Sequence, residues 1–455
     1  LSEMGVVVKA ESVSNVITLS AQMVLDARDL CQSLRNRIVQ QNRNDKAEAS
    51  RQRLDPKYHA HGRNLYQHIR KDRTPPTMTM WDKCNNTYTA NTSRIIELVE
   101  EAWQSVFNRH KDSPPSWAQF DHTYGKYFDN WIIAPTQTPQ ADDMHRHARN
   151  MREHSSPGID GWRPAEVRVL PRSAWQCREK ILNLAIELRT FPTVYRHVLN
   201  PAIPKKADSD KPLDQSVLSV FPALYRVEMG AWYRILAPWF HGNLHPSIRG
   251  GVSGHEALEV SWDAQADLEH ALINLLKEVL LMVDYYKFSD SFDHAWVKDF
   301  LTMLGLPMAL VNMVYDMYTL LLRIIKLGNA YGHAFIGYNG MGQGDVATLL
   351  PALAMVSGQF YMVSQLYPRI RKGACIDDRN FRGPLADLLD MYPHIAKYDK
   401  AAGHFIQPKK TSMAATDADD QSIIKAILLD GHKPKVKDHD VLTGDIVTTS
   451  RRKLR

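Results

Sequence analysis

The chain has 455 residues, of which 44% are hydrophobic and 23% are charged, so most of it can fold. This length exceeds what one small core organises, and two or three subdomains are expected. The net charge is +6, and residues 35–73 alone hold eleven Lys and Arg against four acids. Such a stretch suits a polyanionic partner, although a solvated basic helix face has the same composition. Four scattered cysteines disfavour a disulfide framework or a zinc ribbon.

The sequence predicts neither a targeting segment nor a membrane span. It opens with LSEMGVVVKAES, which has an acid at its third position and only a brief apolar run. The most apolar long stretches are interrupted by Asp316 or Gln359, so an intracellular protein is expected. The first residue is Leu, which favours a fragment of a longer reading frame. The histidine groups at 59–61 and 145–154 lack partners at ligand spacing, which disfavours zinc.

Residues 1–150 are predicted to form a basic, mostly helical N-terminal extension. Its clearest amphipathic segment is SRIIELVEEAWQSVFNRH, residues 93–110, and proline-rich stretches at 112–117 and 134–143 mark its end. After the turn cluster SSPGIDGW, residues 155–162, helical patterns cover 173–190, 222–239 and 256–275. Between the first two, VLNPAIPKK reads as a strand that ends in Lys205 and Lys206.

The segment from 278 onward contains the most informative elements. EVLLMVDYYKFSDSFDH, residues 278–294, begins as a buried strand and reaches an acid at Asp284, and a helical stretch is predicted over 295–325. A glycine-rich loop with Asp345 then opens a long helix over 338–363. A short apolar strand leads into Asp377 and Asp378, and a hairpin is predicted over 426–436.

Three carboxylates therefore stand at strand ends: Asp284, Asp377 and Asp378. Burying such acids without partners costs several kcal/mol each, so a counter-cation is expected. Hard divalent cations prefer carboxylate oxygen, and two Mg²⁺ ions about 3.5–4 Å apart would satisfy all three groups. The alternative is a solvent-facing acidic turn together with an unrelated strand-end aspartate.

Other residues fit a phosphate-bearing ligand near these acids. Gly344 lets the backbone approach a ligand closely, and the amide of Gln343 can hydrogen-bond a base or a sugar; a plain helix-capping turn is the alternative. Lys410 can neutralise or protonate a leaving pyrophosphate, and Lys205 and Lys206 can hold triphosphate oxygens. The alternative for each lysine taken alone is an ordinary surface lysine without a binding role.

The order of these segments resembles the reverse transcriptase domain of non-LTR (LINE-type) retrotransposons, over roughly 150–445. DYYKFSD is similar to the first palm motif of that family, NGMGQGD to its Gln-Gly motif and CIDD to its aromatic-X-Asp-Asp motif. GHFIQPKKT resembles the motif that carries the lysine, and LLDGHKPKVKDHDVLTG the primer-grip region. Upstream, SSPGIDGW and IPKK resemble the fingers turn and strand, and GGVSGHEAL the segment before the first palm motif.

The resemblance implies an α+β right-hand polymerase, with fingers and palm interleaved and an antiparallel palm sheet packed by helices. Residues 151–265 would form the fingers with part of the palm, and 266–455 the palm with the primer-grip region. An RNA-directed DNA polymerase is implied, acting on an RNA template, a DNA primer and a dNTP. Asp284, Asp377 and Asp378 would bind two Mg²⁺, for which Mn²⁺ can substitute, and Lys410 would serve the pyrophosphate. A nuclear location is expected, and the oligomeric state is open.

Three positions depart from the family pattern. Cys375 replaces the usual aromatic residue two before the first acid of the pair, and Ser289 replaces the aromatic that blocks a ribose 2′-hydroxyl, with Phe288 as the alternative for that role. Gln215 and Ser216 stand where the family has Arg-Pro, which leaves Lys206, Lys211 or Arg226 as candidate triphosphate ligands. The sequence ends soon after the primer-grip region, so a truncated thumb is expected. A catalytically degenerate, nucleic-acid-binding palm protein is the alternative function.

Overall fold

A computed structural model describes residues 79–153, 155–205, 210–436, 439–442 and 445–448. The chain divides into two compact units, Leu1–Pro76 and Thr77–Arg455, and every described residue belongs to the second. The predicted extension over residues 1–150 stays a prediction. The basic stretch 35–73 lies outside the described residues. The second unit is a mixed α+β fold, which confirms the predicted class.

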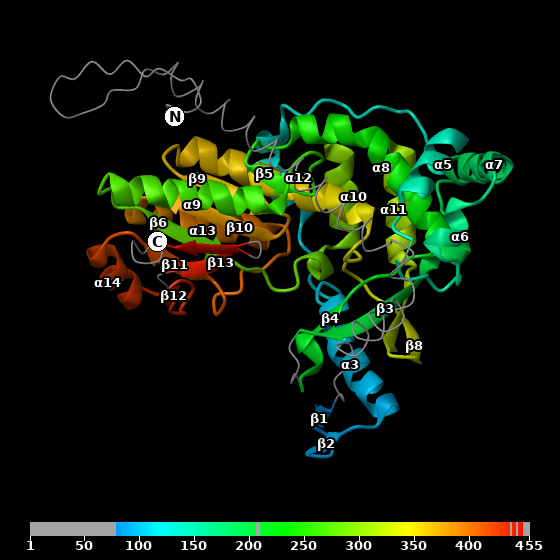
Figure 1. Cartoon of the computed structure of the whole chain (residues 1–455), viewed down its shortest axis with the longest axis horizontal. Helices are drawn as coiled ribbons and strands as arrows, with labels where there is room; N and C mark the ends of the chain where they lie inside the picture. The colour runs from blue at the N-terminus through cyan, green and yellow to red at the C-terminus, as the bar shows by residue number, and fades with distance from the viewer. Residues whose placement is uncertain (1–78, 154, 206–209, 437–438, 443–444, 449–455) are drawn as a thin grey trace, which may run out of the picture. The chain divides into compact units, whose positions relative to one another are not determined.

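Helices and strands alternate along the described unit (Figure 1). The helices are α3 (Thr92–Phe107), α4 (Trp117–Tyr124), η3 (Gly125–Phe128), α5 (Ala141–Asn150), α6 (Pro164–Arg168), α7 (Arg172–Leu188), η4 (Thr193–Arg196), η5 (Pro212–Asp214), α8 (Ala223–Asn243), α9 (Ala257–Ile273), η6 (Ser289–Ser291), α10 (His294–Met303), α11 (Met308–Thr319), α12 (Val346–Leu366), α13 (Leu385–Ala401) and α14 (Ala418–Ala426). The strands are β1 (Met80–Asp82), β2 (Thr87–Thr89), β3 (His197–Pro204), β4 (Gln215–Val217), β5 (Ile248–Gly250), β6 (Val279–Val283), β7 (Leu322–Leu327), β8 (Ala330–Ile336), β9 (Arg371–Cys375), β10 (Asp378–Gly383), β11 (Ser412–Ala415), β12 (Lys435–Val436), β13 (His439–Leu442) and β14 (Asp445–Thr448).

The larger sheet has six strands in the order β12-β11-β6-β10-β9-β5. Its four central strands are antiparallel, and both edge strands, β12 and β5, join in parallel. The predicted antiparallel sheet is therefore present at the centre, while its edges are mixed. Strand β6 lies between β11 and β10, so it pairs with one strand about 100 residues later in the sequence and with another more than 125 residues later.

Both faces of this sheet are covered by helices, as the side chains of β6 demonstrate. Leu281 and its neighbours at 279 and 283 belong to the main core with α12 and α13, whereas Leu280 packs with Val260, Ala264 and Leu268 of α9. Figure 1 shows α9 lying across the sheet. Because alternate side chains point to opposite faces of a strand, a continuous apolar run such as VLLMV suits a strand buried on both sides.

The smaller sheet has four strands in the order β4-β3-β7-β8. A second apolar cluster joins it to α3, and Trp103, Phe107, Val217 and Ile325 are fully or nearly fully buried there. Helix α3 is the amphipathic segment predicted at 93–110, and Asn91 caps it by accepting hydrogen bonds from the amides of the first turn. The two sheets together form the walls of the cavity described below.

The strand predicted near 198–206 is present as β3, the strand predicted at the start of 278–294 is present as β6, and the helices predicted near 173–190, 222–239 and 256–275 are present as α7, α8 and α9. The stretch 295–325 is only partly helical, because α10 ends before Gly305 and α11 starts after Pro307. Gly305 has φ +81°, a conformation that terminates helices. Leu322 then begins strand β7, whose LRIIKL sequence favours extended structure. The predicted hairpin at 426–436 is reduced to a bridge between Leu429 and His432.

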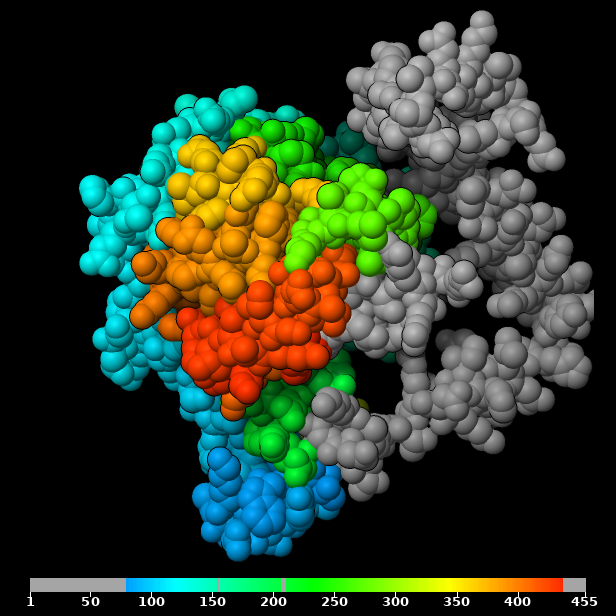
Figure 2. All heavy atoms as spheres, turned by 90° about the vertical axis from the view of Figure 1, so that its left-hand side faces the viewer, coloured from blue at the N-terminus to red at the C-terminus, as the bar shows by residue number. Residues whose placement is uncertain are grey.

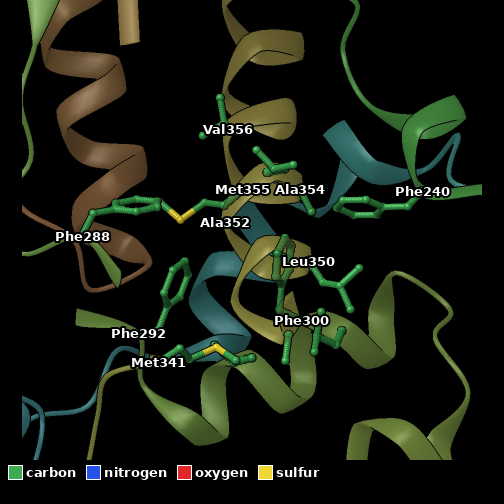
Figure 3. Packing of buried hydrophobic residues seen from close by; sticks show 14 of the residues in the cluster. Phe240, Phe288, Phe292, Phe300, Met341, Leu350, Ala352, Ala354, Met355 and Val356 are labelled. Carbon is green, nitrogen blue, oxygen red and sulfur yellow. The ribbon is translucent and has the colours of Figure 1, made fainter. Parts of the chain in front are cut away.

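Helix α12 is the central core helix of the unit. It is long and apolar enough to cross a membrane, but 83% of its most apolar window is buried inside the protein. Figure 3 shows Leu350, Ala352, Ala354, Met355 and Val356 on this helix, contacted from several sides by aromatic and aliphatic side chains. Its apolar character is therefore explained by packing. At the surface, Lys277 just after α9 forms an ion pair with Asp419 of α14; Figure 2 shows the C-terminal part of the described chain in orange-red.

Candidate active site

A cavity of about 680 Å³ opens between the two sheets. Its walls come from the end of β6, the β9–β10 turn, the loop before α12, the β3 and β4 ends and the segment after α13. The predicted site residues that line it are Lys205, Asp284, Phe288, Ser289, Gln343, Gly344, Asp377, Asp378 and Lys410. Segments separated by up to 205 residues thus meet at one place.

The register of the sheet brings the three carboxylates together. Arg379 of β10 pairs with Val283 of β6, so Asp378 stands beside Asp284 at the next position along the two strands. Asp377 lies in the two-residue loop between β9 and β10, whose first residue, Ile376, has φ +59°. A β-branched residue at positive φ is strained by roughly 1–3 kcal/mol, and such strain concentrates at functional sites.

The electrostatics of the cavity disfavour three ionised acids without a cation. Asp377 and Asp378 open to solvent inside the cavity, yet the surrounding walls desolvate them in part. This burial, followed by repulsion from Asp377 and Asp284, raises the pKa of Asp378 to about 6. Burial also raises the pKa of Asp377. Neither of these two acids forms an ion pair with another residue of the described ranges.

The neighbouring Arg379 does not supply the missing charge, because its side chain points to the opposite face of β10. Its guanidinium is fully buried, forms a 2.8 Å ion pair with Asp399, and donates to Tyr285 Oη and Gln359 Oε1, both at 2.8 Å. This network anchors β10 to the core under α12 and α13, and it fixes the strand that presents Asp378.

Lys410 supplies a cation at the third acid. Its Nζ lies 3.2 Å from Oδ1 of Asp284, and both side chains are partly exposed in the cavity. The turn Gln407–Lys410 is held against the end of β6, because Gln407 N donates to Asp284 O at 2.7 Å. A lysine predicted to serve a leaving group is therefore adjacent to one of the predicted metal ligands.

The Gly-Gln-Gly loop is rigidly held at the N-terminus of α12. Gln343 Nε2 donates to Oδ2 of the buried Asp290 at 3.1 Å, which orients its amide at the cavity wall. Gly344 has φ +96°, which L side chains rarely adopt, and a Cβ on Gly342 would lie 2.6 Å from the Phe221 ring. Asp345 caps the helix and accepts a hydrogen bond from Tyr225 Oη at 2.8 Å.

Lys287 is a cavity residue that the sequence did not single out. It has φ +52°, and its Nζ lies 3.8 Å from the centre of the Trp103 ring and 2.9 Å from Leu213 O. Burial and repulsion from Lys205 lower its pKa to about 8. Lys287 lies in the segment DYYKFSD, three residues after Asp284. This short distance along the sequence from a predicted site acid is the feature that could have identified it as a cavity residue. Lys205, Lys287 and Lys410 make one end of the cavity basic.

Phe288 and Ser289 occupy different environments. Phe288 borders the cavity but is 2% exposed, with its ring 4.5 Å from that of His404. Figure 3 shows the ring pointing toward Met355 of α12 and away from solvent. Ser289 is half-buried at the start of η6. The aromatic ring of Phe288 therefore belongs to the core, and the small Ser289 side chain forms that part of the wall.

Of the two remaining predicted ligands, only Arg226 is described by the structure. Arg226 does not line the cavity; its Nη2 donates to Ser156 O at 3.0 Å. Lys206 lies outside the described residues. Gln215, at the family arginine position, is fully buried, and neither polar atom of its amide has a hydrogen-bond partner in the described structure. Ser216, the next residue of β4, faces the cavity instead.

Cys375 lies at the edge of the site. It is partly buried against the apolar cluster that includes α9, and burial with the nearby acids raises the pKa of its thiol to about 11. It pairs with Gly250 of β5, where an added Cβ would lie 2.5 Å from its Sγ. The strand contact at this point is close, so Cys375 is a small packing residue.

The donor chemistry of the site fits a hard divalent cation. Three carboxylates line one cavity, and two of them have raised pKa values and no ion-pair partner within the described ranges. Among the described residues, no three His, Cys, Asp or Glu side chains are already close enough together to hold a metal ion. Lys410, paired with Asp284, provides the positive charge in this arrangement.

Comparisons with known proteins give no assignment. No protein-family model matches the sequence, and no curated protein matches it significantly. The residues of the cavity are therefore the basis for assigning a function.

Proposed function

We propose that this chain is an RNA-directed DNA polymerase of the reverse transcriptase class, as its resemblance to non-LTR retrotransposon enzymes implies. The observation that carries the proposal is the meeting of Asp284, Asp377 and Asp378 in one cavity with the Gln343–Gly344 loop and two lysines, Lys205 and Lys410. The larger sheet with its helices would be the palm of a right-hand polymerase, and the smaller sheet the fingers. A nuclear location would follow from a retroelement origin.

The chain's own residues have distinct roles in this proposal. Asp284, Asp377 and Asp378 would hold two Mg²⁺ or Mn²⁺ ions, which when bound would lower the pKa of the primer 3′-hydroxyl and neutralise the triphosphate. Gln343, fixed by Asp290, would orient the incoming dNTP, and the bare backbone at Gly344 would let it approach. Lys205 and Lys287 would hold triphosphate oxygens, since both line the cavity and are cationic.

The transfer itself is a substitution at phosphorus. The primer 3′-hydroxyl gives its proton to water, and its oxygen forms a bond to the α-phosphorus as the bond from that phosphorus to the pyrophosphate oxygen breaks. Lys410 can leave Asp284 and give a proton to the departing pyrophosphate, because its ammonium is partly exposed at the cavity. The template–primer duplex would be held by backbone and shape, as expected for an RNA–DNA hybrid.

A degenerate, nucleic-acid-binding palm protein remains the second candidate, favoured by specific observations. Gln215 is buried away from the cavity, and Arg226 donates to a main-chain carbonyl outside it, so a guanidinium ligand for the triphosphate is missing among the described residues. In that case the protein would keep Asp284, Asp377 and Asp378 but would not catalyse nucleotide transfer.

Primer extension separates the two functions. The full chain is given an RNA template, a DNA primer, dNTPs and Mg²⁺ or Mn²⁺, beside an Asp377→Asn, Asp378→Asn double variant that binds template equally well. Extension by the wild type and its loss in the variant supports a polymerase. Template binding by both proteins with extension by neither rejects the polymerase and supports the degenerate protein.

A further inference from the structure

A second group of aromatic and basic residues adjoins the cavity. The segment after α3 carries Arg109, whose Cζ lies 4.7 Å from the centre of the Tyr286 ring and 5.7 Å from that of Phe405. Two residues further on, Lys111 Nζ lies 5.3 Å from the centre of the Tyr338 ring. These five residues are called the aromatic–basic platform below.

The platform is held by main-chain and side-chain hydrogen bonds. Tyr286 N donates to Phe405 O at 2.9 Å, which fixes the two rings relative to each other. Arg109 Nη1 donates to Ser291 Oγ at 2.7 Å, which keeps the guanidinium between them. Four distant parts of the chain, around residues 109–111, 286, 338 and 405, therefore build this surface without a ligand.

The rings of this surface are open to solvent. Phe405 is 43% exposed and Tyr338 is 55% exposed, whereas many other aromatic side chains of the described residues are buried in the core. Tyr286 contributes both to the platform and to the wall of the cavity. The platform thus adjoins the candidate active site through Tyr286.

Exposed aromatic rings with a cation beside each one suit a nucleobase and its phosphate. Bases stack on aromatic side chains without regard to sequence, while Arg and Lys attract the backbone charge. We propose that the aromatic–basic platform binds unpaired nucleotides of a single-stranded nucleic acid at the mouth of the cavity. The two cations, Arg109 and Lys111, are two residues apart, and each lies beside an aromatic ring. Two such pairs favour a nucleic-acid strand of several nucleotides over a single free nucleotide. The choice of a nucleic acid partner rests on the proposed function, but the binding does not require catalysis.

The test measures binding of a labelled, mixed-sequence single-stranded RNA to the full chain by fluorescence anisotropy. Phe405→Ala and Tyr338→Ala are each expected to weaken binding by about tenfold, whereas Tyr338→Phe keeps the affinity. Lys111→Met should lower the slope of log affinity against log salt by about 1. The matched control is Tyr331→Ala, which removes a 57% exposed tyrosine with Lys326 at 5.3 Å from its ring, away from the cavity lining.

Unchanged RNA affinity in the Phe405→Ala, Tyr338→Ala double variant, with an unaltered melting temperature, overturns the proposal. An equal loss in Tyr331→Ala also overturns it, because the effect would then be nonspecific. If both platform variants instead lose affinity for a free dNTP and keep it for RNA, the occupant is a nucleotide and the proposal is wrong. Platform-dependent RNA binding without primer extension rejects only the polymerase, and extension with platform-independent binding rejects only the platform.

Discussion

The ammonium of Lys410 lies 3.2 Å from Oδ1 and 3.4 Å from Oδ2 of Asp284, so it is shared by both oxygens of one proposed metal ligand. A cation that binds this carboxylate competes with the lysine. Release of Lys410 by the incoming cation would place a free ammonium at the cavity, where a leaving pyrophosphate needs a proton. In the proposed polymerase, cation binding and acid catalysis would be coupled through this pair.

Lys410→Met is therefore expected to slow catalysis and at the same time to strengthen Mg²⁺ binding. The rate constant kcat for primer extension should fall by about 10²-fold, because the general acid is lost. The Mg²⁺ concentration needed for half-maximal extension should fall as well, because Asp284 no longer pairs with an ammonium. A titration of extension rate against Mg²⁺ measures both quantities. Lys409→Met, which changes the adjacent exposed lysine outside the cavity lining, is the control; equal effects of the two changes would contradict the coupling.

The raised pKa of Asp378 predicts a pH-dependent stability. With an ordinary pKa of 3.8 when unfolded and about 6 when folded, this group favours folding below pH 4, and that contribution is lost as pH rises through 6. Asp378→Asn should match the wild type at pH 4 and exceed it at pH 7 by about 1 kcal/mol, a figure reduced for the solvent exposure of the group. Urea unfolding without metal at both pH values measures the difference.

Added Mg²⁺ should reverse this order at pH 7, since a bound cation stabilises only the protein that retains the ligand. Primer extension should likewise fall as pH drops below 6, because protons compete with the cation for Asp378. A variant no more stable than the wild type at pH 7 would show that the carboxylate is not destabilised in its cavity.

Gly344→Ala should disturb nucleotide binding through the backbone. At φ +96° a Cβ is strained by about 1–3 kcal/mol, so the loop is expected to shift and to displace Gln343. The KM for dNTP should rise while primer–template affinity is retained. The control is Gly242→Ala within α8, where an added Cβ meets no atom within 4 Å and stability should rise by about 0.5 kcal/mol. Equal KM values for both variants would exclude a role for the loop.

Arg379→Met should strongly destabilise the protein. The guanidinium is fully buried with Asp399, and removing one partner of a buried pair costs about 3–5 kcal/mol. The double change Arg379→Met, Asp399→Leu should recover most of this loss, since no buried charge is then unpaired. Arg172→Met, which breaks an exposed pair with Asp142, should cost less than about 1 kcal/mol. Chemical denaturation of all three variants provides the comparison.

Much of the fold, and several of the residues that line the cavity, could be predicted from local pattern. The alternation and length of apolar runs predicted β3, β6 and α12, and the acids that follow β6 and β9 were predicted as one site. The helix predicted over 295–325 was only partly correct, because Gly305 at φ +81° separates α10 from α11 and Leu322 begins strand β7. The α+β class follows from these local signals.

The direction of each side chain was decided only by the tertiary structure. Strand parity turns Ser216 to the cavity and Gln215 away from it, and the position of α8 leaves Arg226 on a carbonyl outside the site. Lys287 reaches the cavity through a positive φ that the residue type does not predict.

The sequence by itself thus determined which chemical groups the strands end in. Which of them share a cavity depends on long-range strand register and packing, since a one-residue change of register turns a side chain to the other face of the sheet. For the same reason the pairing of Lys410 with Asp284, 126 residues apart, required the folded chain.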